Sequence, residues 1–159
     1  MKTALLAVLT AALLVAPAGA QPHTQGHRLV LTGVGRFAVL ADLSTVSREG
    51  DRVRLRSLQV TEADFQAGGQ TYLGGWSWWS FDCAAGTADR LDFASVREGG
   101  GEGPATADPA PAYDAAPGGD AAELLAVACD PSSAGEADAT NLADAIRIGR
   151  AALADRDMD

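Results

Sequence analysis

Few residues of this 159-residue chain could act as a nucleophile, a base or a metal ligand. Its only two histidines, His23 and His27, both lie near the N-terminus. Nucleophilic catalysis by serine or cysteine needs a histidine or an equivalent base within hydrogen-bond reach, and this placement argues against it. A zinc site would lack ligands, because both cysteines are far from the histidines in sequence. We therefore expect no metal site and no cofactor.

Carboxylates are the remaining candidates for acid–base chemistry. Asp82 and Asp92 could form a catalytic pair, but acidic residues are common here and no spacing selects two of them. Gly99 to Gly101 are followed by neither a lysine nor a helix pattern, which argues against a phosphate-binding loop. We therefore predict no catalytic residues. A hydrolase that uses carboxylates alone is the rival interpretation.

Residues 1–20 have the pattern of a secretory signal peptide. Lys2 supplies the positive start, Leu5 to Val15 the apolar run, and Ala18 to Ala20 the small residues before the cleavage site. The apolar run is shorter than the roughly 20 residues of a membrane-spanning helix, so we expect no membrane insertion. The mature chain would begin at Gln21 and be exported to the periplasm, the cell surface or the medium.

The two cysteines, Cys83 and Cys129, most simply form one disulfide in an exported chain. The bridge would close a loop of about 46 residues and stabilise the fold by roughly 4 kcal/mol in the chain-entropy model. That is a large share of the stability of a small domain.

Negative charge is concentrated in the C-terminal part of the chain. From residue 98 onward there are thirteen acidic and three basic residues, and the formal net charge of the whole chain is −9. Such a surface repels nucleic acid and anionic lipid. Proteins remain as partners, and a homodimer is left open.

A mostly β domain must position these side chains, and we place its central strand at Trp76 to Cys83. Strand geometry sends alternate side chains to opposite faces, so Trp79, Phe81 and Cys83 should face the core. Trp76 and Trp78 then share the other face. Tryptophans that stay near the surface are over-represented at binding hot spots.

A second strand is expected from Arg52 to Val60. Arginines at 52, 54 and 56 alternate with apolar residues at first, and the apolar residues then change parity. This change predicts a β-bulge near Ser57. The arginines either bind an acidic ligand or form a solvated strand face. The predicted binding face combines side chains of the two strands: Trp76, Trp78, Arg52, Arg54 and Arg56.

Further short strands are expected at residues 28–32, 36–42, 70–73 and 90–96, which gives five or six strands, and their short connections imply antiparallel pairing. We read residues 42–51 as a polar connection. Residues 99–119 are rich in glycine, proline, alanine and acidic residues and cannot bury enough surface to offset their ordering entropy. We predict a mobile loop there.

Two helices are expected after this loop. The first runs from Ala121 to Cys129, with Asp120 and Glu123 at the spacing of a capping box. The second lies nearer the C-terminus, is capped by Thr140 or an earlier serine, and has an apolar stripe on one side. The stripe consists of Leu142, Ile146, Gly149 and Leu153. It could pack on its own domain, where it would cover the tryptophans, or on a partner.

A larger pattern joins several segments of the chain: Asp42 to Val46, the Gly50 turn, the strand from Arg52, Phe81 to Cys83, Arg90, Tyr113, Pro117 to Gly119, and Leu124 to Cys129. Together they resemble the surface-adhesin protein E family of proteobacteria, over roughly residues 28–130. Here Tyr113 stands where the family has a tryptophan, Gly119 stands where it has a serine, and the glycine- and proline-rich segment is longer.

The resemblance implies an α+β fold, in which a curved antiparallel sheet of five to six strands carries a C-terminal helix tied to it by the disulfide. The expected organisation is a signal peptide at 1–20, an adhesin E-like domain at 21–130 and a helical extension at 131–159. The resemblance also implies a non-catalytic protein that binds host or envelope proteins at a bacterial surface. The alternatives are a structural or stress-related periplasmic protein without an adhesive role and the carboxylate-dependent hydrolase.

Overall fold

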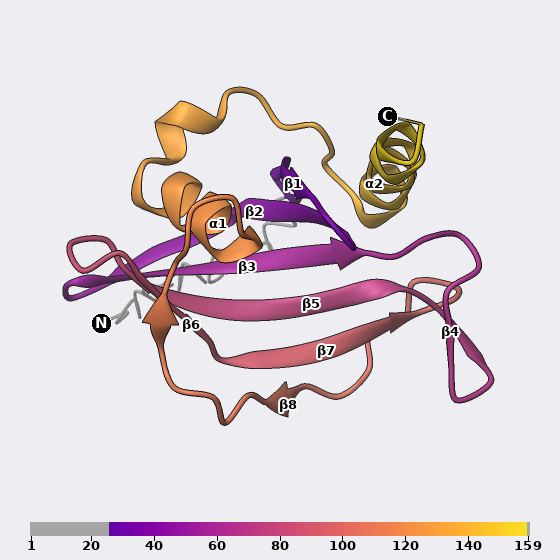
Figure 1. Cartoon of the computed structure of the whole chain (residues 1–159), viewed down its shortest axis with the longest axis horizontal. Coiled ribbons are helices and arrows are strands. Elements are labelled where there is room, and N and C mark those ends of the chain that lie inside the picture. Colours follow the sequence, from indigo (N-terminus) through magenta and orange to yellow (C-terminus); the bar gives the residue numbers. More distant parts are fainter. Residues whose placement is uncertain (1–25, 159) are drawn as a thin grey trace, which may run out of the picture.

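The structure, a computed structural model, describes residues 26–158. The expected signal peptide and His23 lie outside the described residues. The described part is an α+β fold in which helices pack on a nine-stranded antiparallel sheet (Figure 1). This confirms the predicted fold class. Three of the nine strands are only two residues long, which accounts for the lower number expected from sequence.

The strands, in chain order, are β1 (Leu29–Val34), β2 (Ala38–Glu49), β3 (Arg52–Val60), β4 (Gln66–Ala67), β5 (Gln70–Asp82), β6 (Thr87–Arg90), β7 (Asp92–Arg97), β8 (Thr106–Ala107) and β9 (Tyr113–Asp114). The helices are α1 (Asp120–Cys129), a short 3-10 helix (Pro131–Ala134) and α2 (Leu142–Arg156). None of the helices between residues 26 and 158 combines the length and apolar character needed to span a membrane.

The strand that carries the tryptophans, β5, lies at the centre of the sheet. The strand order is β1-β2-β3-β5-β6-β9, and β5 pairs with β3 from Gly74 to Asp82. On its other side β5 pairs with β7 along its first half and with β6 along its second half. The prediction of a central tryptophan strand is therefore confirmed.

Each face of the sheet carries one helix and one cluster of buried side chains. Trp79 and Phe81 lie in the cluster under α1, as alternation along the strand predicts. Trp76 lies in the cluster under α2. A Cβ atom at Gly149 of α2 would lie 2.8 Å from the Cβ atom of Val60, so the glycine lets this helix approach β3 closely. The apolar stripe of α2 thus packs on its own chain.

The disulfide between Cys83 and Cys129 is present, with the two Cα atoms 5.8 Å apart. It joins the residue after β5 to the last residue of α1, as predicted. It therefore holds the end of this helix against the end of the central strand.

Both helices begin differently from the sequence prediction. Asp120 is the first residue of α1, and the cap is Gly119, which has no side chain to make a capping hydrogen bond. The predicted capping box is therefore wrong. The cap of α2 is Asn141, one residue after the expected Thr140, and its Oδ1 accepts a hydrogen bond of 2.9 Å from the Asp144 N–H.

The predicted β-bulge near Ser57 is wrong. The register between β3 and β5 runs without a shift from the pair Arg52–Asp82 to the pair Val60–Gly74. The apolar parity changes because helices cover opposite faces of the sheet at the two ends of β3: Val53 and Leu55 lie in the cluster under α1. Leu58 and Val60 lie in the cluster under α2, whereas the arginines lie beyond it.

The irregularity lies instead in β2, where a polar connection was expected. The register between β2 and β3 shifts between Asp42 and Ser47. Thr45 bridges the two strands there, because its hydroxyl donates to the Asp42 carbonyl oxygen at 2.7 Å and accepts the Arg56 N–H at 2.9 Å. The strand then continues to Glu49.

Residues 99–119 are not the unstructured loop that composition predicts. They follow the edge of the sheet, where β8 pairs with β7 and β9 pairs with β6 (Figure 1). Arg90 Nε contacts Asp108 Oδ2 at 2.7 Å, and the hydrogen bond from the Ala110 N–H, followed by that of Arg90, lowers the pKa of Asp108. Backbone hydrogen bonds and ion pairs thus hold a segment that has few apolar side chains, and it covers two edge strands.

Candidate functional site

The register of β3 and β5 brings the predicted binding residues together on one sheet face. Arg52 lies opposite Asp82, Arg56 lies opposite Trp78, and Trp76 is the next residue along the same face. We call Arg52, Arg54, Arg56, Trp76 and Trp78 the tryptophan–arginine face.

Cation–π contacts connect the members of this face. The Arg54 guanidinium carbon lies 5.1 Å from the centre of the Trp78 ring. The Arg56 guanidinium carbon lies 4.6 Å from the Trp76 ring and 5.9 Å from the Trp78 ring. Such contacts are worth about 0.5–2 kcal/mol each and hold the long arginine side chains in place.

The two tryptophans differ in exposure. Trp76 is only 4% exposed, because α2, Arg56 and His27 cover it, so a partner cannot reach its ring in this structure. Trp78 is partly exposed and is not among the buried residues under α2. The accessible part of the tryptophan–arginine face is therefore Trp78 with the surrounding arginines.

Two glutamates neutralise the central arginines. Arg54 Nη1 contacts Glu49 Oε1 at 3.2 Å, and Arg56 Nη2 contacts a carboxylate oxygen of Glu102. The Nε atoms of both arginines are buried and have no hydrogen-bond partner among the described residues. Arg52, the first residue of β3, is exposed. The face is thus a nearly neutral platform of guanidinium and indole groups and not a concentrated positive patch.

Sequence reasoning missed a histidine–carboxylate pair beside this face. His27 Nδ1 lies 2.6 Å from Asp42 Oδ2, and its ring stacks on Trp76 with the centroids 5.3 Å apart. The Asp42 side chain is fully buried and also accepts the backbone N–H of Arg28 and of Ser44 and the Ser44 hydroxyl. The sequence does contain a signal for this pair: Asp42 follows a run of apolar strand residues, and a buried carboxylate needs hydrogen-bond partners.

The hydrogen bonds to Asp42 determine its ionisation. Burial alone would raise its pKa, but the hydrogen bonds from Ser44, His27 and the Arg28 N–H outweigh burial and lower it. The carboxylate is therefore charged near neutral pH and orients the imidazole of His27, whose side chain is 40% exposed. The Ser44 hydroxyl donates to Asp42, so it is not activated by the histidine.

The two carboxylates weighed as a catalytic pair have structural roles. Asp82 Oδ1 accepts the N–H groups of Ala84 and Ala85 in the turn after β5. Asp92 Oδ1 accepts the Trp78 N–H at 2.8 Å. The Asp92 carboxylate lies at Trp78, and Trp78 and Asp82 are four residues apart on one strand, which is about 13 Å. The two carboxylates therefore do not form a pair. Between residues 26 and 158 there is no group of three or more metal-ligating side chains.

The comparisons with known proteins identify one family. A family model described as surface-adhesin protein E matches residues 30–130, which include all of the sheet except Leu29, and α1. No curated protein and no solved structure matches the chain.

Proposed function

We propose a binding function on this premise: the chain belongs to the surface-adhesin protein E family, a family of adhesin-like surface proteins. In this proposal the protein is an exported, non-catalytic module of the bacterial envelope. It binds a host or envelope protein through the tryptophan–arginine face.

The observation that carries this proposal is the placement of Trp78. Its ring is partly exposed, lies outside the cluster under α2, and is held between Arg54 and Arg56. Tryptophan and arginine are the residue types most enriched at binding hot spots. The contacts between these rings and guanidinium groups already order the side chains. Binding of a partner therefore costs less conformational entropy in them.

The ion pairs of the face suggest how a partner binds it. Glu49 and Glu102 are each partly exposed and each holds one guanidinium group. A carboxylate of a partner can replace either glutamate on its guanidinium group, and the displaced glutamate, which is already exposed, is then hydrated by solvent, while an apolar or aromatic group covers Trp78. We therefore expect an acidic, apolar-containing segment as the partner surface, with an affinity that falls as salt is added.

Two alternatives remain testable. A structural or stress-related periplasmic protein would use the fold without capturing a partner at Trp78. A hydrolase would use paired carboxylates such as Asp82 and Asp92, whose oxygens accept backbone N–H groups in this structure. Hydrolase activity that disappears in Asp82→Asn or Asp92→Asn would favour the enzyme.

Site-specific photo-crosslinking in cells of the native organism tests the proposal. A photoreactive amino acid at position 52, on the face, should give one defined adduct with another protein, whereas the same group at the exposed position 64 should not. In the chain labelled at 52, Trp78→Ala should weaken binding of the identified partner about 30-fold or more.

Tyr113→Ala is the matched control, because Tyr113 is an exposed aromatic residue on the distant strand β9. It should leave the adduct unchanged. An adduct that survives Trp78→Ala, or the absence of any adduct from position 52, would contradict a role of this face in binding.

A further inference from the structure

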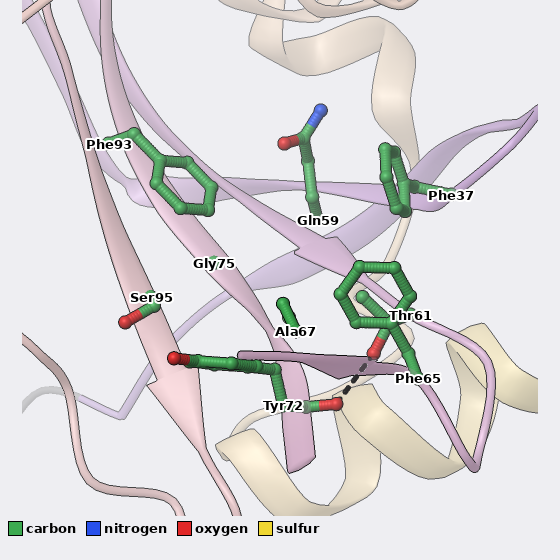
Figure 2. Close-up of a pocket in the computed structure, with 10 residues that line it drawn as sticks. Phe37, Gln59, Thr61, Phe65, Ala67, Tyr72, Gly75, Phe93 and Ser95 are labelled. Atoms are coloured by element: carbon green, nitrogen blue, oxygen red, sulfur yellow. Dashed lines mark hydrogen bonds between the residues drawn. The ribbon is translucent and has the colours of Figure 1, made fainter. Parts of the chain in front are cut away.

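An apolar cavity lies on the sheet face opposite to the tryptophan–arginine face. Its volume is about 340 Å³, which is within the range of small-molecule pockets. Four aromatic rings surround it (Figure 2). The lining residues are Phe37, Gln59, Thr61, Phe65, Ala67, Tyr72, Gly74, Gly75, Phe93 and Ser95.

The floor of the cavity is part of the sheet that α1 does not cover. Gln59, Gly75 and Ser95 are paired neighbours in one row across β3, β5 and β7. A Cβ atom at Gly75 would overlap the ring of Phe93. The glycine therefore allows this ring to lie across the central strand, where it forms one wall of the cavity.

The opposite wall comes from the β4 hairpin and the turn before β2. Phe65 and Ala67 project from the hairpin, whose turn contains Gly68 and Gly69 with positive φ. The rings of Phe65 and Phe37 meet edge to face, with the centroids 6.4 Å apart. The hairpin extends beyond the main sheet in Figure 1.

The polar groups of the cavity limit what can bind. None of the ten lining residues has a charged side chain. The Thr61 hydroxyl already donates to the Tyr72 carbonyl oxygen at 2.8 Å, as the dashed line in Figure 2 shows. The Gln59 amide stands between Phe93 and Phe37 in Figure 2, and within residues 26–158 no hydrogen bond to it is found. The exposed lining of the cavity is almost entirely apolar.

We propose that this cavity binds a neutral, mostly apolar small molecule with one or two planar rings. A charged ligand would lose its hydration without gaining a partner. The volume matches one or two rings, and the aromatic walls favour stacking and edge contacts with them. The site is separate from the tryptophan–arginine face, because the two lie on opposite sides of the sheet, and it goes beyond the proposed protein binding.

Fluorescence titration with the neutral two-ring probe 1-naphthylamine tests the proposal. The full mature chain should bind one equivalent in a saturable manner, and indole should displace it. Ala67→Trp fills the cavity from the exposed hairpin and should abolish binding. Gln66→Trp places the same bulk on the adjacent residue, which does not line the cavity, and should bind like the wild type.

Ligand chemistry is tested by a comparison of neutral with charged ligands. Naphthalene, which has no hydrogen-bonding group, should bind at least as well as indole, because the lining is almost entirely apolar. The charged analogue indole-3-acetate should bind the wild type at least about tenfold more weakly than indole.

Three results would overturn the proposal. The first is no saturable binding of the probe or of indole up to about 1 mM. The second is equal binding by Ala67→Trp and Gln66→Trp. The third is a dimer at high protein concentration that Ala67→Trp converts to a monomer, because the occupant of the cavity would then be a second copy of the chain.

Discussion

Replacement of Asp42 by asparagine should destabilise the fold by about 2 kcal/mol at pH 7. The amide oxygen can still accept the three hydrogen bonds that Oδ1 accepts, from the Arg28 N–H, the Ser44 N–H and the Ser44 hydroxyl. The amide nitrogen would replace Oδ2, which lies 2.6 Å from His27 Nδ1. The variant therefore loses one hydrogen bond to a charged group and the charge that strengthens the others, worth about 1.5–3 kcal/mol.

The cost of this substitution should depend on pH. Hydrogen bonds lower the pKa of Asp42 in the folded state, whereas its value in the unfolded chain is about 3.9. The ionised carboxylate therefore contributes its stability above about pH 4, and this contribution is lost as the pH falls through the lower folded-state pKa. Protonated Asp42 is close to asparagine in shape and charge, so the difference between wild type and variant should shrink in acid.

Urea denaturation followed by tryptophan fluorescence measures this difference at pH 7 and at about pH 3. Asp64→Asn removes the same charge from an exposed position and should change the free energy of unfolding by less than about 0.5 kcal/mol. A double-mutant cycle with His27→Gln should give a coupling energy of about 1 kcal/mol or more. A cost of Asp42→Asn below about 0.5 kcal/mol at pH 7, or an equal cost at both pH values, would refute the reasoning.

Three further predictions concern the two helices. Replacing Cys83 and Cys129 by serine should lower the free energy of unfolding by about 4 kcal/mol in urea denaturation, and a loss under about 1 kcal/mol would argue against the loop-entropy account. Ending the chain after residue 131 removes α2 and should shift tryptophan fluorescence to the red and lower Tm; an unchanged spectrum would mean that α2 does not shield the ring beneath it. Gly149→Val should cost about 1–3 kcal/mol in thermal denaturation through overlap with β3, whereas Val at the exposed Ala151 should cost less than about 1 kcal/mol.

Local patterns predicted the elements and the faces of the strands. The alternation in Trp76 to Cys83 correctly assigned Trp79 and Phe81 to the core, and the apolar stripe of α2 correctly predicted a packed helix. The two cysteines correctly predicted the disulfide. The strand faces and the helix stripe follow from the side-chain periods of strands and helices, and the disulfide follows from there being two cysteines. Both can be read from the sequence without knowing the tertiary contacts.

Other features depend on contacts between distant residues, and local patterns do not contain them. Residues 99–119 have few large apolar side chains, so composition predicts disorder, yet the edges of β6 and β7 supply their hydrogen-bond partners. The parity change in β3 predicts a bulge only if the same face of the strand is assumed to be buried along its whole length. In the structure α1 covers one face at the start of the strand, and α2 covers the opposite face at its end.

The sequence by itself determined that the chain has a tryptophan strand with two distinct faces, three arginines on one face of a neighbouring strand, and one disulfide. Only the tertiary structure decided which tryptophan is accessible, which carboxylate holds His27, and where the sheet leaves a cavity. The physical reason is that alternation assigns a side chain to a face, whereas burial depends on what packs over that face. His27 and Asp42, fifteen residues apart, and Arg56 and Glu102, forty-six residues apart, meet only after the register of the sheet has brought them together.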